Sequence, residues 1–298
     1  MRLLRKLLEK NIRIKNMIPK TIHYCWFGRN AKPKLAETCI RSWKYRCPDY
    51  TIQEWNEDNF DLSTCPLYVR QAYAEKKWAF VTDYVRLRII FEHGGIYMDT
   101  DVELLKPLDY LLHYNAFFGY EDGVCIATGL GFGAEKGTPV LLRMMEDYND
   151  IPFLLENGKY DAVPCPARNT EALKELGLKQ DDSKQILDGN ILILPTSYLC
   201  PIDFQTRVKR IHRHTLSIHW YSGSWYTEEE KRCREELQRR ARREKVTGPI
   251  QTAVKNALGE EGWYRWQERL ERYSSWDQVK RMPRRIVRKL LGKSNAEE

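Results

Sequence analysis

One stretch of the chain, residues 78–108, limits the possible folds more than any other. Its sequence is WAFVTDYVRLRIIFEHGGIYMDTDVELLKPL. A largely apolar segment of helical length comes first and runs into a Gly-Gly pair at 94 and 95, where we expect the helix to end in a left-handed cap. Residues 96–98 then have the composition of a buried strand, which ends in Asp99-Thr100-Asp101. Helix, glycine pair, strand and acidic turn in this order predict an α/β fold.

Two carboxylates, Asp99 and Asp101, stand one residue apart at the end of the predicted strand. Side chains alternate along an extended chain, so both would lie on the same side and face the crevice in which open α/β sheets bind ligands. Oxygen donors of this kind suit a hard divalent cation that also accepts phosphate oxygens. The alternative is an acidic turn that follows an edge strand and holds no ligand.

Two charged residues, Asp83 and Arg86, interrupt the apolar helix. Their spacing of three places them on one helix face, and a charge on a mostly buried helix is costly unless it is paired or used. One interpretation is that they simply pair with each other. The other is that they bind a polar ligand, which their position one helix before the acidic pair favours.

A third candidate ligand lies far along the chain, in residues 215–225 (TLSIHWYSGSW). Alternation predicts that Thr215, Ser217 and His219 share one face of a strand and point into the crevice, while the apolar residues between them pack. Imidazole is a frequent metal ligand, so His219 is placed to complete a metal shell. The alternative is a structural histidine.

Together these residues resemble the signature of the DXD-motif glycosyltransferases with the GT-A fold. The nearest branch is glycosyltransferase family 32-like and holds bacterial capsule and lipopolysaccharide sugar transferases and fungal initiating mannosyltransferases; the glucosylating domain of the large clostridial toxins is a distant relative. That family carries D-x-x-R on a helix and then G-G-x-Y-x-D-x-D, matched here by Asp83, Arg86, Gly94, Gly95, Tyr97, Asp99 and Asp101. Its closing H-x-W/F-x-x-S-W is matched by His219, Ser224 and Trp225.

The resemblance implies a GT-A fold, that is, a Rossmann-like, mixed and mostly parallel sheet flanked by helices. It implies that Mn²⁺ or Mg²⁺ is held by Asp99, Asp101 and His219. It also implies that Asp83 and Arg86 contact the donor sugar or its phosphates, and that Asp99 bridges toward the nucleotide sugar. The remaining residues of the implied nucleotide-sugar site are Trp26, which stacks on the base or alternatively belongs to the core, Tyr97, and Ser224 with Trp225, which close over the diphosphate.

The chain departs from the family's pattern in two places. A polar residue, usually Asn, precedes the family's G-A-x-K-G-x-P sequence, and Thr128 stands in the equivalent position here. Residues 164–170 occupy the place of a T-G-P-x-x-x-T turn but keep mainly Pro166 and Thr170. We therefore expect the donor-sugar contact at Thr128 and the recognition of the acceptor to differ from the family's pattern.

Charge and composition divide the chain into three segments. Residues 1–16 have the spacing of a basic amphipathic helix, which either lies on a membrane or packs on the next segment. Residues 17–226 form the predicted catalytic domain, and residues 227–298 a helical, basic C-terminal appendage. The appendage holds 19 Lys and Arg against 13 Asp and Glu from residue 228 on, and so carries most of the net charge of +8. Because the main domain is close to neutral, we expect no nucleic-acid partner.

The end of the appendage, residues 279–293, predicts a contact with an anionic membrane. The sequence PRRIVRKLL within it places four aliphatic residues on one helix face among basic ones; the alternative is a solvated helix packed on the catalytic domain. We find no apolar run of transmembrane length and no N-terminal signal, and the eight cysteines include no C-x-x-C pair. These features predict a cytoplasmic enzyme, peripheral at the inner face of the membrane.

The sequence thus predicts a retaining hexosyltransferase that uses a UDP-sugar, or else a GDP-sugar, as donor. Its acceptor would be a saccharide or a lipid-linked saccharide in the synthesis of capsule, lipopolysaccharide or another cell-surface glycan. The alternative is a metal-dependent nucleotidyltransferase or phosphohydrolase acting on sugar nucleotides, which usually needs further carboxylates to hold two metal ions. A non-catalytic basic binding protein would leave the charged helix residues, the acidic pair and His219 unexplained.

Overall fold

The computed structural model describes residues 17–161, 163–204 and 206–223, together with residues 232, 235–237 and 239. The chain divides into two compact units, Met1–Thr227 and Glu228–Glu298, and every element named below belongs to the first. The predicted helix at residues 1–16 and nearly all of the predicted appendage lie outside the described residues. None of the described helices combines the length and the hydrophobicity that crossing a membrane requires.

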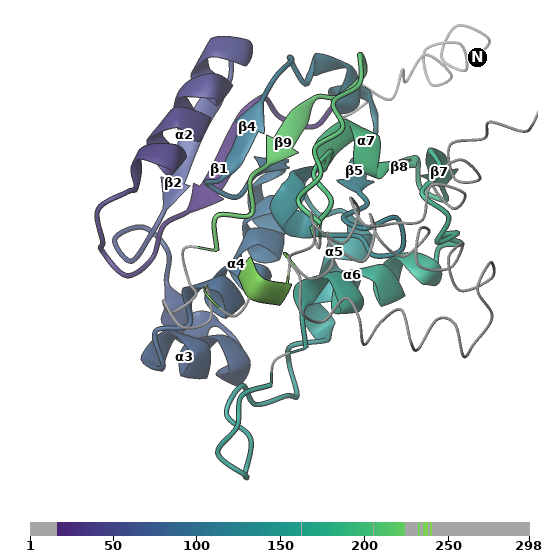
Figure 1. Ribbon diagram of the computed structural model, residues 1–298. Helices are drawn as coiled ribbons and strands as arrows, with labels where there is room; N and C mark the ends of the chain where they lie inside the picture. Colours follow the sequence, from purple (N-terminus) through teal and green to yellow (C-terminus); the bar gives the residue numbers. More distant parts are fainter. Residues whose placement is uncertain are drawn as a thin grey trace, which may run out of the picture. The chain divides into compact units, whose positions relative to one another are not determined.

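A seven-stranded sheet with the strand order β2-β1-β3-β6-β5-β8-β7 forms the centre of this unit (Figure 1). Three of its six strand pairings are parallel and three are antiparallel. The prediction of a mostly parallel sheet is therefore wrong, although the sheet is mixed as expected. The strands are β1 (Thr21–Cys25), β2 (Thr51–Trp55), β3 (Gly95–Tyr97), β5 (Ala116–Gly119), β6 (Phe132–Ala134), β7 (Gln185–Leu187) and β8 (Ile191–Leu194).

The antiparallel pairings have a local cause. Strands β7 and β8 are joined by a turn in which Gly189 and Asn190 have φ values of +77° and +58°, and such turns connect neighbouring antiparallel strands. Strands β5 and β6 follow one another without an intervening α-helix, whereas a parallel connection needs a long crossover. The prediction of parallel strands did not take these short connections into account.

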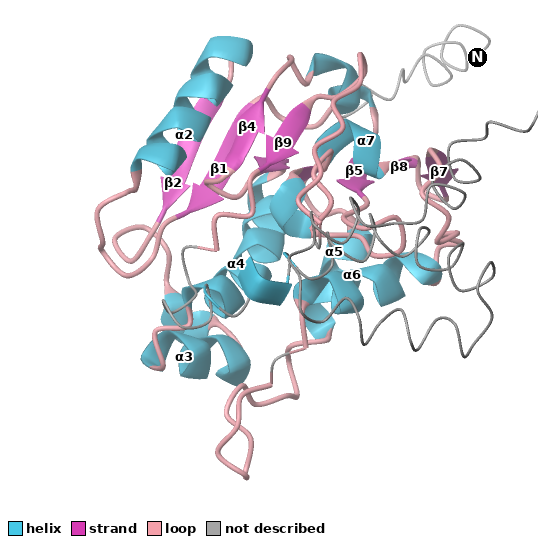
Figure 2. Ribbon diagram, in the orientation of Figure 1, coloured by secondary structure: helices cyan, strands magenta, loops and turns pink. Residues whose placement is uncertain are grey.

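Alternate side chains of the central strands enter two different cores, one on each face of the sheet. Phe118 joins a core formed with α3 (Leu67–Ala74), α4 (Trp78–His93), α5 (Pro139–Glu146) and α6 (Cys165–Lys174). Phe117 joins a core on the opposite face, whose other elements are α2 (Lys34–Arg46), α7 (Thr196–Leu199) and β4 (Val102–Leu104), the partner of β9 (Ser217–His219). The unit is therefore a three-layer α/β structure (Figure 2). Three short 3-10 turns complete it, namely η1 (Leu62–Thr64), η2 (Asp109–His113) and η3 (Thr128–Leu130).

The Gly-Gly pair ends helix α4 at the predicted place, but not with the predicted cap. Gly94 has a φ of +69° with a ψ of −177°, so its backbone is not in the left-handed helical conformation. A Cβ on Gly94 would lie 2.9 Å from the Lys136 backbone nitrogen, and one on Gly95, at φ +107°, would lie 2.8 Å from His23 Nε2. The pair is needed because it lets the chain turn sharply and lets β3 approach its neighbours closely.

Two further expectations about local structure are wrong. Residues 165–170, expected as a turn, begin helix α6 instead. Thr215 and Ser217 are buried rather than directed into a crevice. Their hydroxyls donate hydrogen bonds to the carbonyl oxygens of Ser197, at 2.8 Å, and Leu199, at 3.2 Å, because α7 covers this face of the β9 segment.

Candidate active site at the acidic turn

The acidic turn connects strands β3 and β4. It is a turn rather than an extended strand end, because the Val102 N–H donates to the Asp99 carbonyl oxygen at 3.0 Å. Two contacts fix Asp99, whose N–H donates to the Gly129 carbonyl oxygen at 3.2 Å and whose Oδ1 accepts from the Tyr97 hydroxyl at 3.0 Å. The predicted alternation of an extended strand therefore does not place the two carboxylates; the turn and its neighbours do.

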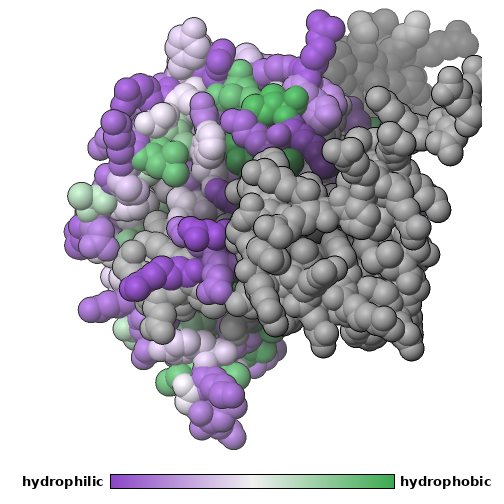
Figure 3. All heavy atoms as spheres, in the orientation of Figure 1, coloured by the Kyte–Doolittle hydropathy of each residue, from purple (hydrophilic) through white to green (hydrophobic). Residues whose placement is uncertain are grey.

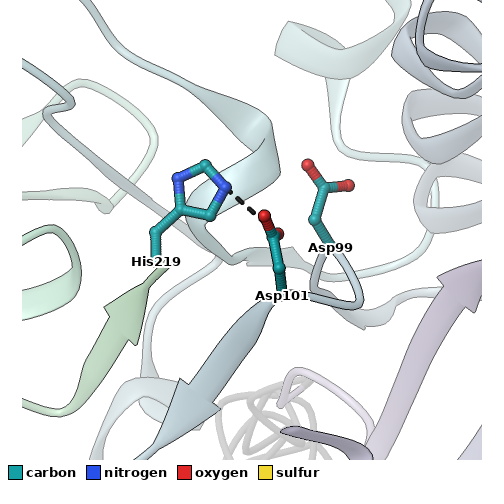
Figure 4. Close-up of side chains that lie close together, drawn as sticks. All are labelled: Asp99, Asp101 and His219. Atoms are coloured by element: carbon teal, nitrogen blue, oxygen red, sulfur yellow. Dashed lines mark ion pairs between the residues drawn. The ribbon is translucent and has the colours of Figure 1, made fainter. Parts of the chain in front are cut away.

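Strand β9 brings His219 to the acidic turn. It pairs antiparallel with β4 in a register that sets Val102 opposite His219, and the Trp220 N–H donates to the Asp101 carbonyl oxygen at 2.9 Å. As a result His219 Nε2 lies 3.2 Å from Asp101 Oδ1 (Figure 4). The other carboxylate oxygen, Oδ2, accepts the Ser222 N–H at 2.7 Å. The fold thus joins two predicted site residues that are far apart in the sequence.

Asp99, Asp101 and His219 each offer a ligand atom, and these atoms lie within 4.8 Å of one another. Two carboxylates and an imidazole fit Mn²⁺ or Mg²⁺, and three protein donors leave coordination positions for other oxygens. The space beside Asp99 is kept by Gly129, where a Cβ would lie 2.3 Å from Asp99 Oδ2 and 3.0 Å from Arg86 Nη1. The arrangement therefore fits the predicted ion in both its donor set and its close packing.

The charges of this cluster depend on one another. Burial by itself would raise the pKa of Asp101, but His219 and the Ser222 N–H stabilise the carboxylate, and its pKa lies below the ordinary value. Burial would lower the pKa of His219, yet the Asp101 carboxylate raises it well above the ordinary value. A cation that binds His219 must displace its proton, so binding at this cluster should strengthen as the pH rises.

The charged pair on helix α4 is buried directly beside Asp99. Arg86 Nη2 donates to Asp83 Oδ1 at 2.7 Å, and Arg86 Nη1 lies 3.6 Å from Asp99 Oδ2. Burial raises the pKa of Asp83 and of Asp99, and the Arg86 guanidinium opposes the increase in both. Both interpretations of the pair are thus compatible with the structure, because Asp83 and Arg86 pair with each other and also adjoin the acidic turn.

The remaining predicted site residues differ in what the structure shows of them. Tyr97 is buried, with the Arg86 guanidinium carbon 5.3 Å from its ring centroid. Trp26 is half-buried against the core that contains α2, and its Nε1 donates to the Asn30 carbonyl oxygen at 2.7 Å. Thr128 is buried, and its hydroxyl accepts from Asn169 Nδ2 at 3.0 Å. Ser224 and Trp225 lie outside the described residues.

Sequence reasoning missed the contributions of Gly129, Cys165 and Ser222. Gly129 lies in the sequence GLGFG, and a glycine in such a segment can mark a close backbone approach. Cys165 is the first residue of helix α6, and its thiol favours a lower pKa of the Asp83 carboxyl. Ser222 contributes a backbone N–H, for which a sequence carries no signal.

Comparison with known proteins assigns the segment that contains helix α4 and the acidic turn. Residues 33–118 match the family described as "Glycosyltransferase sugar-binding region containing DXD motif", so this segment of the chain is similar to the DXD-motif glycosyltransferases. Trp26 and His219 lie outside the matched residues.

Two curated relatives come from Schizosaccharomyces pombe. The chain is 31% identical over 139 residues to inositol phosphoceramide mannosyltransferase 3. The aligned region covers 46% of this chain and 38% of the relative. It is 28% identical over 110 residues to inositol phosphoceramide mannosyltransferase 1, which covers 34% of this chain and 33% of the relative. The similarity thus spans well under half the length of either relative.

Two solved structures are similar over larger shares of the chain. One is titled PaToxG glycosyltransferase, with a TM-score of 0.42, 18% sequence identity, and coverage of 58% of this chain and 77% of that one. The other is a glycosyltransferase involved in the glycosylation of the major capsid of PBCV-1, with a TM-score of 0.38, 12% identity, and coverage of 73% and 99%.

Proposed function

We propose that this protein is a metal-dependent, retaining glycosyltransferase of the GT-A type, which moves a hexose from a nucleotide-diphosphate sugar to a saccharide acceptor. One observation carries the proposal. The ligand atoms of Asp99, Asp101 and His219 lie within 4.8 Å of one another, and the buried pair of Asp83 and Arg86 adjoins them. A sugar donor needs both parts, a cation site for its diphosphate and buried polar groups for its hydroxyls.

In this proposal Asp99, Asp101 and His219 hold Mn²⁺ or Mg²⁺, which when bound supplies positive charge for the diphosphate leaving group. Asp83 accepts hydrogen bonds from hydroxyls of the donor sugar. Arg86 was expected to contact sugar or phosphate, but its side chain is only 4% exposed and is bound to Asp83 and Asp99. We therefore propose that Arg86 mainly holds these two carboxylates in position.

The stereochemical part of the proposal rests on the family resemblance. Retention of the anomeric configuration without a covalent intermediate requires the acceptor hydroxyl to attack the donor sugar from the same face from which the leaving group departs. Tyr97 and Trp26 complete the proposed nucleotide-sugar site, Trp26 by stacking on the base. Ser224 and Trp225 would close over the diphosphate.

For the donor, we propose that GDP-mannose be tested beside the UDP-hexoses that the sequence favours. Both curated relatives are named as mannosyltransferases, which supports a mannosyl donor. For the acceptor, their names specify a phosphate-bearing sphingolipid, which supports a lipid-linked acceptor over a free sugar. A cytoplasmic enzyme at the inner face of a membrane, held there by residues 279–293, agrees with that choice; those residues lie outside the described part of the chain.

The alternative, a nucleotidyltransferase or phosphohydrolase, usually holds two metal ions with additional carboxylates. Within the part of the chain that the structure describes, the acidic turn and His219 form the one group of three or more such ligands. This favours a transferase that uses a single cation.

The test is to incubate the protein with Mn²⁺ and a panel of UDP- and GDP-sugars, without acceptor. Slow release of a nucleoside diphosphate and a free sugar from one donor is expected, and Asp101→Asn should abolish it. Release of a nucleoside monophosphate and a sugar phosphate would instead identify a phosphohydrolase. No turnover of any donor, together with no binding of nucleoside diphosphate in calorimetry, would refute the proposal.

A further inference from the structure

The loop that precedes strand β9 presents a basic surface with exposed aliphatic side chains. We define the basic loop as residues 206–214, of sequence TRVKRIHRH. Several hydrogen bonds fix its shape. The Arg210 N–H donates to the Pro201 carbonyl oxygen and the Asp203 N–H to the Val208 carbonyl oxygen, at 2.8 and 3.0 Å. His214 Nε2 lies 2.8 Å from Ser197 Oγ on helix α7. These hydrogen bonds hold the loop in a defined conformation.

The exposed residues of this loop are of two kinds. Lys209, Arg210 and Arg213 are exposed cations, and none of them forms an ion pair with a carboxylate in the described part of the chain. Between them stand Val208 and Ile211, whose side chains are 43% and 48% exposed. Exposure of these aliphatic groups to water is unfavourable, and their transfer to an apolar environment would be favourable. Figure 3 draws one face of the molecule, on which hydrophobic and strongly hydrophilic surface lie next to each other.

The sequence around the loop contains almost no opposing charge. From residue 204 to residue 223 there is no Asp or Glu. The acidic residue just before this stretch, Asp203, uses Oδ1 to accept from both the N–H and the hydroxyl of Thr206, each at 2.6 Å. The cations of the loop are therefore not balanced by any carboxylate within residues 204–223.

The basic loop borders the proposed active site. Lys209 Nζ lies 4.9 Å from the Trp220 ring centroid, and Arg207 Nη2 donates to the Trp220 carbonyl oxygen at 2.6 Å. Trp220 directly follows His219 and donates its backbone N–H to Asp101. A ligand that binds to the loop would thus be held next to the group formed by Asp99, Asp101 and His219.

We propose that the basic loop is a docking surface for a bilayer that contains anionic lipids, and that it presents a membrane-resident acceptor to the active site. The proposal rests on the proposed function for its purpose, but the lipid contact itself can be tested without turnover. Cations interleaved with aliphatic side chains suit a lipid interface, where the cations meet head groups and the aliphatic groups leave water. Nucleic acid would use the cations but leave Val208 and Ile211 exposed.

The experiment is sedimentation of the full chain with phosphatidylcholine vesicles, with and without phosphatidylglycerol. The test variant is Lys209→Gln/Arg210→Gln/Arg213→Gln. The matched control is Lys34→Gln/Arg41→Gln/Lys44→Gln, which removes three exposed cations from helix α2. Each cation near an anionic leaflet contributes about fivefold in partitioning, so the test variant should partition about a hundredfold more weakly and the control much less so. Val208→Ser/Ile211→Ser should also weaken binding. Because this variant removes aliphatic contacts and no charge, the loss that it causes should not depend on the salt concentration.

Several results would overturn the proposal. They are equal partitioning of the test and control variants, equal partitioning onto charged and neutral vesicles, and an effect of the loop variants on binding of an RNA oligonucleotide but not of vesicles. Failure of the proposed function is distinguishable, because a chain that turns over no sugar nucleotide can still lose vesicle binding when the loop is neutralised. Circular dichroism of each variant confirms that the fold is retained.

Discussion

The buried pair on helix α4 makes the sharpest prediction about this protein. Arg86→Met removes a guanidinium whose side chain is 4% exposed, and with it the 2.7 Å contact to Asp83 and the 3.6 Å contact to Asp99. Two partly or fully buried carboxylates then lose their common cation. Breaking a buried ion pair by removing one partner costs about 3–5 kcal/mol. For a domain of this size that corresponds to a fall in Tm of roughly 6–20 °C.

The pH dependence of this loss follows from the sign of the pKa shifts. Burial already raises the pKa of Asp83 and of Asp99, and Arg86 opposes the increase. Without Arg86 both values rise further, so the folded variant binds more protons than its unfolded chain at a pH above the ordinary carboxyl pKa. The stability difference between wild type and variant should therefore be largest at neutral pH and shrink as the pH falls toward the ordinary carboxyl range.

The assay is urea unfolding of wild type, Arg86→Met, Asp83→Asn and the double variant. The double variant should be more stable than Arg86→Met alone, because it removes one of the uncompensated charges. Arg143→Met is the matched control. Its ion pairs with Asp147 and Glu175 lie at the surface, and its loss should cost about 0.2–1 kcal/mol. A loss for Arg86→Met no greater than that of the control, or one unaffected by Asp83→Asn, would refute the reasoning.

Three further predictions concern the cation cluster and a buried histidine. Asp101→Asn and His219→Ala should each nearly abolish turnover and Mn²⁺ binding, followed by electron paramagnetic resonance, and each should also lower Tm because it breaks the largely buried pair of Asp101 and His219. Near-normal activity of Asp101→Asn in chelator-treated buffer would show that no cation is needed there. Gly129→Ala should weaken Mn²⁺ binding, because its Cβ would lie 2.3 Å from Asp99 Oδ2, and unchanged affinity would mean that the carboxylate position is not critical. His23 is buried and its pKa is lowered from 6.5 to about 4. As the pH falls from about 6.5 to about 4, the unfolded chain therefore takes up a proton at His23 while the folded chain does not. The free energy of unfolding should fall by about 3 kcal/mol over this pH range. His23→Gln should remove this part of the slope in urea unfolding at a series of pH values, and an unchanged slope would assign it to other groups.

Local patterns predicted the parts of the site that lie in one continuous stretch. Helix α4, its end at the glycine pair and the acidic turn follow one another within residues 78–104, so periodicity and turn chemistry were sufficient to identify them. The same patterns predicted His219 as a candidate ligand, but not the way in which it reaches Asp101. They also misjudged Thr215 and Ser217, because alternation separates the two faces of a strand without showing which face another element covers.

What the sequence by itself determined is the α/β character of the chain, the order of its main elements and the types of residue that carry chemistry. Only the tertiary structure decided that three of six strand pairings are antiparallel, that Gly129 adjoins Asp99, and that Arg86 serves two carboxylates at once. It also decided the register of β4 on β9, which sets Val102 opposite His219 and so assembles the cluster. The physical reason is that propensity and periodicity act over a few residues, whereas strand partners, registers and buried ion pairs depend on packing between segments that are distant in the sequence.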